Sequence, residues 1–378
     1  MSEREATAAA TRGALDGVRI VEFAGLGPAP FAAMLLSDMG ADVLRVARPG
    51  DAAEWSSRAI DRGRRTVEAD LKNATDVARV AALLDAAEVL IEGFRPGVME
   101  RLGLGPETLL ARNPRLVYGR MTGWGQTGPL AHAAGHDIDY IALTGALAAI
   151  GPAAQPVPPL NLVGDYGGGA LYFVTGVLAA VISARRTGLG QVVDCAICDG
   201  TASLTTLFVE LAQRDRWSQR REANLLDGGA PFYRTYACAD GAFVALGALE
   251  PHFYAVFLER AGLNPADFER EDVAQWPALH EKLAAVFRTR TRAEWCALLE
   301  GTDACFAPVL TLAEAPAHPH LAARETFVEC DGTLVPAPAP RFSGTPSRIR
   351  SLPVEPLSLD AALATWSARE DGEATPPR

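Results

Sequence analysis

The chain has 378 residues, which is more than one typical domain holds, and 49% of them are hydrophobic and 21% charged. This composition is ordinary for a globular protein with a sizeable core and excludes wholesale disorder. The 35 Lys and Arg residues against 46 Asp and Glu residues give a formal net charge of −11. We therefore expect no nucleic-acid partner, although an acidic surface can still enclose one basic pocket.

Through the first half of the chain, apolar strand patterns alternate with amphipathic helix patterns. The strand patterns cover residues 18–23, 42–46, 66–69, 89–92 and 116–121, and the helix patterns cover 30–39 and 73–84. A turn at Gly25-Leu26-Gly27-Pro28 precedes the first helix, and Gly40 is placed to end it. Strands that alternate with helices are typical of parallel βαβ units, so this pattern predicts an α/β fold with a doubly wound parallel sheet.

The second half begins with a long helix pattern at 165–186, followed by a strand at 191–194 and a helix at 200–213. The polar stretch 214–227 is typical of a linker. Two strand patterns flank Cys238-Ala239-Asp240-Gly241, which is a strong hairpin signal, and helices near 251–261, 276–288 and 292–299 complete a smaller α/β unit. The stretch 335–346, with its repeated prolines, predicts an extended return linker, and the tail from Ala368 predicts disorder.

These patterns divide the chain into domains and indicate where it resides. We expect a large domain that starts with residues 1–213, a linker at 214–230, a small α/β domain at 231–315, a return linker at 316–347, and a C-terminal part of the large domain with the tail at 348–378. The longest apolar stretch, Ala170 to Ala184, predicts a buried helix and no membrane partner. The start MSEREATAAATRG lacks a signal-peptide pattern and the final GEATPPR matches no retention or lipidation signal, so we expect a cytoplasmic protein.

The cysteines and histidines show no pattern of a metal or disulfide site. The cysteines are Cys195, Cys198, Cys238, Cys296, Cys305 and Cys330. Cys195-x-x-Cys198 has no second Cys or His pair near it and lies in the apolar segment GQVVDCAICDG, which favours buried thiols. No H-E-x-x-H spacing occurs, and we predict that the protein holds no metal.

Two segments after the 116–121 strand could carry chemistry. Gly123-x-Gly125-x-x-Gly128 formally matches a dinucleotide fingerprint, but Pro129 follows where a helix should open, so a loop at the carboxyl end of a strand is favoured. His136 then precedes Asp137 and Asp139. A histidine can exchange a proton near neutral pH, and a neighbouring carboxylate can fix its tautomer. From these residues alone, a hydrogen-bonded loop histidine is the favoured interpretation.

Asp165 stands in Gly164-Asp165-Tyr166-Gly167-Gly168-Gly169, at the head of the long helix pattern. The first amides of a helix lack internal partners, and glycines let a ligand approach the backbone closely. Amides at 167–169 could therefore stabilise developing negative charge such as an enolate oxygen. A plain N-cap aspartate is an equally open interpretation. Glu250, before Pro251 at a strand end, is by default a solvated carboxylate.

Basic residues gather early in this acidic chain: Arg45, Arg48, Arg58, Arg62, Arg64, Arg65, Lys72, Arg95 and Arg101. Arginine suits bidentate contact with phosphate, so a phosphate pocket is one interpretation. The alternative is scattered surface charge, partly neutralised by Asp51, Glu54 and Asp61.

Over nearly its whole length the chain resembles the α-methylacyl-CoA racemases of the family III CoA-transferase (CaiB/BaiF) superfamily. The stretches that carry this resemblance are LDGVRIVEFAGLGPAP, GADVLRVARPG, EADLK, IEGFRPGVMERLGLGP, RMTGWGQTGP, GHDIDYIALTG, PPLNLVGDYGGG, TGLGQVVD, LLDGGAPFY, GALEPHF and PAPAPRF. The resemblance implies a Rossmann-like large domain and a small α/β domain joined by long linkers. It also implies a homodimer in which two chains interlock.

The resemblance assigns roles to individual residues. The positions that match those holding CoA are Arg48, Ala69, Asp70, Leu71, Lys72, Gly93, Phe94, Arg95 and Arg101. The positions that match the loop beside the thioester are Gly135, Asp137, Ile138, Asp139 and Tyr140. His136 matches one catalytic base, Asp165 the other, and Glu250 the acid associated with that histidine, which in the interlocked dimer would come from the partner chain.

The chemistry implied is a proton exchange at the carbon next to a thioester carbonyl. One base removes the α-proton from one face and gives an enolate, and the opposite base reprotonates the other face, which inverts C2. CoA is part of this substrate, and no cofactor is expected. The alternative is CoA transfer with Asp165 as nucleophile, which is less favoured because transferases generally lack His136 and Glu250 in these contexts. A CoA-binding protein without turnover is disfavoured because every catalytic position is filled.

Overall fold

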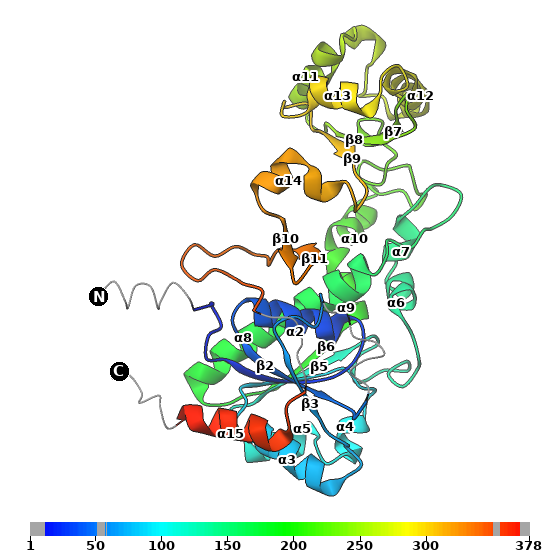
Figure 1. Ribbon diagram of the computed structural model, residues 1–378. Helices are drawn as coiled ribbons and strands as arrows, with labels where there is room; N and C mark the ends of the chain where they lie inside the picture. The colour runs from blue at the N-terminus through cyan, green and yellow to red at the C-terminus, as the bar shows by residue number, and fades with distance from the viewer. Residues whose placement is uncertain (1–11, 51–56, 58, 351–355, 371–378) are drawn as a thin grey trace. The chain divides into compact units, whose positions relative to one another are not determined.

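The structure, a computed structural model, describes residues 12–50, 57, 59–350 and 356–370, and it divides into two compact units (Figure 1). The first unit contains the described residues up to Thr144, Leu160–Leu204 and those from Glu325 onward. The second contains Gly145–Pro159 and Thr205–Arg324. The segment 145–159 belongs to the second unit because the Arg221 guanidinium donates hydrogen bonds to the carbonyls of Ala148, Pro152 and Ala153, at 3.0, 2.9 and 3.1 Å.

The first unit is built on a six-stranded parallel sheet with the order β3-β2-β1-β4-β5-β6. Its strands are β1 (Arg19–Phe23), β2 (Asp42–Ala47), β3 (Arg65–Glu68), β4 (Val89–Glu92), β5 (Val117–Thr122) and β6 (Val192–Ala196). Each overlaps a predicted strand, which confirms the mixed α/β fold with a parallel sheet. The apolar runs were recognisable because both faces of these strands are buried.

Helices cover both faces of this sheet (Figure 1). Successive side chains of a strand point to opposite faces, so Ile20 packs into one core and Val21 into the other. The first core includes α2 (Pro28–Asp38) and α8 (Tyr172–Thr187). The second includes α3 (Ala74–Asp85), α5 (Pro106–Arg112) and α15 (Leu359–Glu370), whose Trp366 is 1% exposed.

The segment predicted as one helix at 165–186 is two elements. A π-helix, η1 (Leu162–Leu171), leads directly into α8. Together they form a helix whose length and composition could cross a membrane, and half of its most apolar window is buried. Phe173 and Val177 pack into the core of the sheet, as the sequence predicts for a buried helix.

The second unit has a three-stranded antiparallel sheet with the order β7-β8-β9. Its strands are β7 (Tyr233–Ala237), β8 (Phe243–Gly247) and β9 (Phe306–Val309). The predicted hairpin of β7 and β8 is confirmed, and Gly241 takes the left-handed φ of 78° that its turn requires. The larger helices, α11 (Pro251–Ala261), α12 (Trp276–Phe287) and α13 (Arg292–Leu299), bury Phe257, Phe287 and Trp295 against it.

The shorter elements complete the description: α4 (Val98–Arg101), α6 (Asp137–Leu143), α7 (Ala146–Ala149), α9 (Ile197–Leu204), α10 (Thr206–Gln213), η2 (Pro265–Asp267), η3 (Val273–Gln275), η4 (Ala315–Ala317), α14 (Pro319–Ala323), β10 (Phe327–Cys330) and β11 (Thr333–Pro336). The last two pair as an antiparallel hairpin inside the stretch predicted as a return linker. Of the tail predicted to be disordered, residues 368–370 end α15, and the remainder lies outside the described residues.

Candidate active site

A cavity of about 630 Å³ opens at the carboxyl ends of β1 to β4 in the first unit. It is lined by Phe23, Ala24, Val46, Ala47, Arg48, Ala69, Asp70, Leu71, Lys72, Phe94, Arg95, Val98 and Leu102. Parallel strands end at the same edge of a sheet, and the strand order reverses between β1 and β4, where ligands of such sheets bind. Most positions predicted to hold CoA therefore line one cavity, whereas Gly93 and Arg101 lie outside its lining.

Three exposed cations stand at this cavity. Arg48 follows β2, Lys72 follows β3 and Arg95 follows β4. Among the described residues, none of the ion pairs involves these three side chains. Each cation follows a different strand, so the sheet brings the three charges to one opening. This arrangement suits a ligand with several phosphates.

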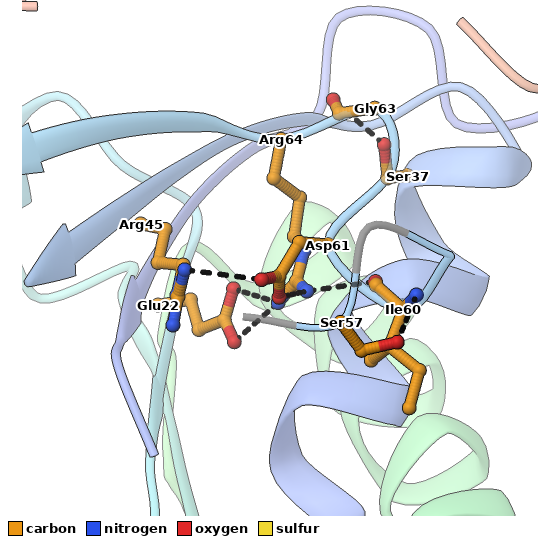
Figure 2. Close-up of polar contacts among 8 residues, drawn as sticks. All are labelled: Glu22, Ser37, Arg45, Ser57, Ile60, Asp61, Gly63 and Arg64. Atoms are coloured by element: carbon orange, nitrogen blue, oxygen red, sulfur yellow. Dashed lines mark hydrogen bonds and ion pairs between the residues drawn. The ribbon is translucent and has the colours of Figure 1, made fainter. Parts of the chain in front are cut away.

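Four of the other early arginines, Arg45, Arg62, Arg64 and Arg65, pair with carboxylates, and the phosphate-pocket interpretation is corrected for them. Arg64 donates hydrogen bonds to both carboxylate oxygens of Glu22 at 2.5 Å and to Asp61 at 2.5 Å (Figure 2). The Arg45 guanidinium lies 3.4 Å from the same Asp61 carboxylate, and Ile60 O accepts from Arg64 at 2.7 Å. These charges are buried, and a buried guanidinium needs carboxylate partners of its own.

Two further arginines are paired in the same way. Arg62 lies 2.6 Å from Asp38, and Arg65 lies 2.7 Å from Asp42. Arg58 lies outside the described residues. Most of the early arginine excess therefore ties segments of the first unit together and is not available to a ligand.

Asp137, which follows His136 and begins α6, links this part of the chain to Asp165. His136 is exposed immediately before α6, and its backbone amide donates to the Asp139 carboxylate at 2.9 Å. The next residue, Asp137, is buried and accepts a hydrogen bond from the Asp165 amide at 2.6 Å. The start of α6 and the first turn of η1 are thus bonded to each other directly beside the two predicted bases.

The Asp165 carboxyl is held in a half-buried setting that favours proton exchange. Burial raises the pKa of Asp165, and a hydrogen bond from the Asn161 amide, at 3.4 Å, opposes this. The negative charge of Asp137 raises the same pKa, and the positive charge of His136 lowers it. A carboxyl whose pKa lies above its usual range, beside a histidine, can act as base and as acid.

The turn before α2 closes one side of this carboxyl. A Cβ at Gly27 would lie 3.3 Å from Asp165 Oδ2, and Gly27 has a φ of 73° that disfavours other residues. The ring of Tyr166, next in the chain, stacks on Phe31 of α2 with centroids 4.2 Å apart. The strand-to-helix turn after β1 is therefore shaped to fit against Asp165.

The glycine run does not leave free amides at a helix start, which corrects the enolate-binding interpretation of residues 167–169. These glycines lie inside η1, where amides donate to carbonyls five residues earlier. Their structural reason is close packing against α9: a Cβ at Gly168 would lie 2.5 Å from Thr201 Oγ1, and one at Gly200 would collide with the Gly168 carbonyl. Asp165 is accordingly within η1 and does not act as a plain N-cap.

The loop after β5 packs against α6. Tyr140 of α6 donates its hydroxyl hydrogen to the Gly135 carbonyl, and its ring meets Trp124 edge-on with centroids 4.7 Å apart. A Cβ at Gly123 would collide with the Tyr140 ring. Gly123 of the fingerprint-like segment therefore serves contact with Tyr140, while Ile138 is 45% exposed on the same helix.

Glu250 lies in the second unit. It is the exposed N-cap of α11, and its side chain makes no capping hydrogen bond. His136 and Asp165 belong to the first unit.

A buried charge cluster at the end of β4 has no counterpart among the sequence-based predictions. Glu92 at the end of β4 is fully buried, and it accepts hydrogen bonds from the Phe94 amide at 2.7 Å and from Arg120 at 2.9 Å. Arg120 also binds Glu100 of α4 at 2.8 Å. Burial raises the pKa of Glu92 to about 7. No local pattern predicts this cluster, because Arg120 is 28 residues from Glu92 along the chain.

The cysteines show no feature of a reactive site. Burial raises the pKa of Cys195 to about 12, and its Sγ lies 3.6 Å from the Gly169 carbonyl. Within the described ranges, no group of three or more His, Cys, Asp or Glu residues could hold a metal ion. The absence of a metal and of a cofactor remains a prediction.

The sequence profile of CoA-transferase family III matches residues 15–357, so the chain belongs to this family. Within it, the chain is 47% identical to alpha-methylacyl-CoA racemase of Mus musculus over 337 residues, which covers 88% of this chain and 87% of that protein. It is 44% identical to alpha-methylacyl-CoA racemase of Homo sapiens over 337 residues, covering 88% of both proteins.

The fold also matches a solved structure. A CAIB/BAIF family protein from Brucella suis superimposes with a TM-score of 0.79 and 26% identity, covering 95% of this chain and 100% of that one. The predicted family resemblance is therefore confirmed over most of the chain.

Proposed function

We propose that this chain is an isomerase that inverts C2 of 2-methylacyl-CoA thioesters by moving a proton between the two faces of that carbon. The observation that supports the proposal is the hydrogen bond between α6 and η1, in which Asp137, the residue after His136, accepts from the Asp165 amide, while the charge of His136 acts on the Asp165 carboxyl. Its two racemase relatives support the same reaction.

The reaction needs two groups that exchange roles. For one enantiomer, the base removes the α-proton and the electron pair moves into the thioester carbonyl to give an enolate. The second group, protonated at that moment, then donates to the opposite face of C2. For the other enantiomer the same steps run in reverse. Burial raises the pKa of Asp165, which favours a carboxyl that acts as acid as well as base in this exchange.

The cavity supplies a site for CoA. Arg48, Lys72 and Arg95 bind its phosphates in this proposal, while Ala69, Asp70, Leu71 and Phe94 form the wall. Gly93 and Arg101 lie on the chain segment that leads from β4 through α4. Because CoA is part of the substrate, the proposed reaction requires no cofactor.

The assembly that we propose is a homodimer in which Glu250 of one chain supports His136 of the other. Glu250 is exposed and free of a capping role, and α10 exposes Leu207 and Val209, which suits contact with a second chain. The strand order β3-β2-β1-β4-β5-β6 supports the proposed Rossmann-like doubly wound character of the large domain. The further expectations are a cytoplasmic protein without a nucleic-acid or membrane partner.

The competing function is CoA transfer, which the family name allows and for which Asp165 would attack the thioester as a nucleophile. A single assay separates the two. One enantiomer of a 2-methylacyl-CoA is incubated in deuterated water with a free carboxylic acid, NMR follows deuterium at C2 and the epimer ratio, and chromatography follows new thioesters.

Deuteration with convergence to both epimers and no new thioester is expected. A new acyl-CoA without exchange at C2 would contradict the proposal and assign transferase chemistry instead.

A further inference from the structure

The Asp137 carboxylate spans the two elements that carry the proposed bases. It directly follows His136 in the chain, and its Oδ1 accepts the Asp165 amide hydrogen at 2.6 Å. A hydrogen bond from the Gly164 amide also lowers the pKa of this carboxylate. Its residue is 9% exposed, and within the described residues its Oδ2 has no hydrogen-bond partner. Oδ1 of this carboxylate is therefore turned toward the backbone at the start of η1.

The packing around Gly164 leaves no room for a side chain beside this hydrogen bond. A Cβ at Gly164 would collide with Asp137 Oδ1 and would lie 2.8 Å from Cγ2 of Ile141 in α6. The first amides of a helix lack partners in their own helix, so a buried acceptor at the start of η1 satisfies donors that would otherwise be orphaned. Glycine at 164 and aspartate at 137 therefore form one matched contact.

We propose that Asp137 is a positioning residue that sets the separation of His136 and Asp165 by bonding the start of α6 to the first turn of η1. This rests on the proposed function, and it gives the Asp137 side chain a task different from contact with the thioester. Two bases that serve one carbon from opposite faces must both stay in reach of it, and a misplacement of about 1 Å costs on the order of 100-fold in rate.

The charged surroundings of Asp165 give a second readout. The charges of Asp137 and His136, at the start of α6, act on the pKa of Asp165. The charges of Asp165 and Arg95 act in turn on the pKa of the Tyr140 hydroxyl in α6. The charge of Asp137 raises the pKa of Asp165. Asp137→Asn retains an oxygen acceptor but removes this charge, so the acid limb of kcat/KM should move to lower pH for the enantiomer whose proton Asp165 removes.

The test compares Asp137→Ala with Asp137→Asn, and uses Asp42→Asn as the matched control. Asp42 is a carboxylate at the amino end of β2, at the opposite edge of the sheet from the cavity, where it binds Arg65. Each enantiomer of a 2-methylacyl-CoA is followed in deuterated water for both α-deuteration and inversion. The ratio of the two rates does not depend on how much of the protein is folded, so it separates positioning from stability.

For Asp137→Ala we expect a kcat for inversion that is lower by about 100-fold, a KM within about threefold of wild type, and more deuteration per inversion. Asp137→Asn should restore most of the turnover with the shifted pH limb, and Asp42→Asn should match the wild type. An unchanged ratio in Asp137→Ala, or no restoration by Asn, would overturn the inference. Wild-type protein without any α-exchange would instead refute the proposed function itself.

A glycine substitution tests the same contact if Asp137→Ala does not fold. Gly164→Ala keeps Asp137 but pushes its carboxylate aside, so it should also raise deuteration relative to inversion. Gly344→Ala is the control, because nothing lies within 4 Å of a Cβ there. Equal ratios in these two variants would refute the positioning role.

Discussion

Removal of the Arg64 guanidinium should destabilise the first unit strongly, because it leaves buried carboxylates behind. The Arg64 side chain is 1% exposed, and it binds Glu22, which is fully buried, as well as Asp61 and the Ile60 carbonyl (Figure 2). Arg45 remains 3.4 Å from Asp61 in the Arg64→Ala variant, so the loss falls mainly on Glu22.

Breaking a buried ion pair by removing one partner costs about 3–5 kcal/mol. That is a large part of the 5–15 kcal/mol by which domains are typically stable. The pKa of Glu22 is already above its usual range because of burial, and Arg64 is the main influence that lowers it. Without Arg64 that pKa rises further, so the penalty relative to the wild type should grow as the pH rises above the pKa that Glu22 has in the wild type.

Urea unfolding of the wild type and Arg64→Ala at pH 5 and pH 8 measures this penalty. The double variant Arg64→Ala with Glu22→Gln should recover part of it, most clearly at pH 8. Arg186→Ala, which removes an exposed arginine in the last turn of α8, should change the free energy of unfolding by less than about 0.5 kcal/mol. A loss below about 1 kcal/mol for Arg64→Ala, equal at both pH values, would refute the reasoning.

Three further predictions concern the site. His136→Ala and Asp165→Asn should each abolish inversion with the far-UV circular dichroism spectrum retained, and either variant racemising at the wild-type rate would contradict the two-base assignment. Arg48→Ala should raise the KM for acyl-CoA about tenfold or more with kcat unchanged, because a charge-assisted phosphate contact is worth about 1.5–3 kcal/mol; Arg186→Ala is the control, and an unaltered KM would remove Arg48 from the phosphate site. The pKa of Glu92 is about 7 in the folded protein against 4.5 for the ordinary group. As the pH rises, the unfolded chain therefore loses this proton before the folded protein does. The wild type should therefore lose about 3 kcal/mol of unfolding free energy relative to Glu92→Gln between pH 4.5 and pH 8, and parallel pH curves in urea would contradict this.

The parts of the fold that could be predicted depend on local patterns. Strands such as 42–46 and 89–92 are buried on both faces and stand out as apolar runs, and their carboxyl ends then locate Arg48 and Arg95. The prediction fails where partners are distant in the chain. Arg64 and Glu22 are 42 residues apart, so the arginine excess resembles a ligand site until the fold pairs it.

The glycine run shows a different kind of failure. Gly167 to Gly169 have the composition of a loop that approaches a ligand, but their small size admits α9 at Thr201, which is a tertiary requirement. The π-helix also escapes prediction from the sequence, because the shift in hydrogen bonding at 162–171 leaves no mark in the spacing of apolar residues. Asp137 was recognised as a site position by resemblance, whereas the direction of its side chain is visible only in three dimensions.

The path of the chain through the first unit has a consequence for the order of folding during synthesis. The Leu357 amide donates to the Thr66 carbonyl at 2.8 Å, and Trp366 of α15 packs into the core that β1 and β2 begin. These residues leave the ribosome only after all of 205–324, which have a separate core. The second unit can thus complete its core first, while the part of one apolar face of the parallel sheet that α15 covers, beside α3 and α5, stays uncovered until the last fifty or so residues emerge. Chaperone binding to the nascent chain would be concentrated on that apolar face during this interval.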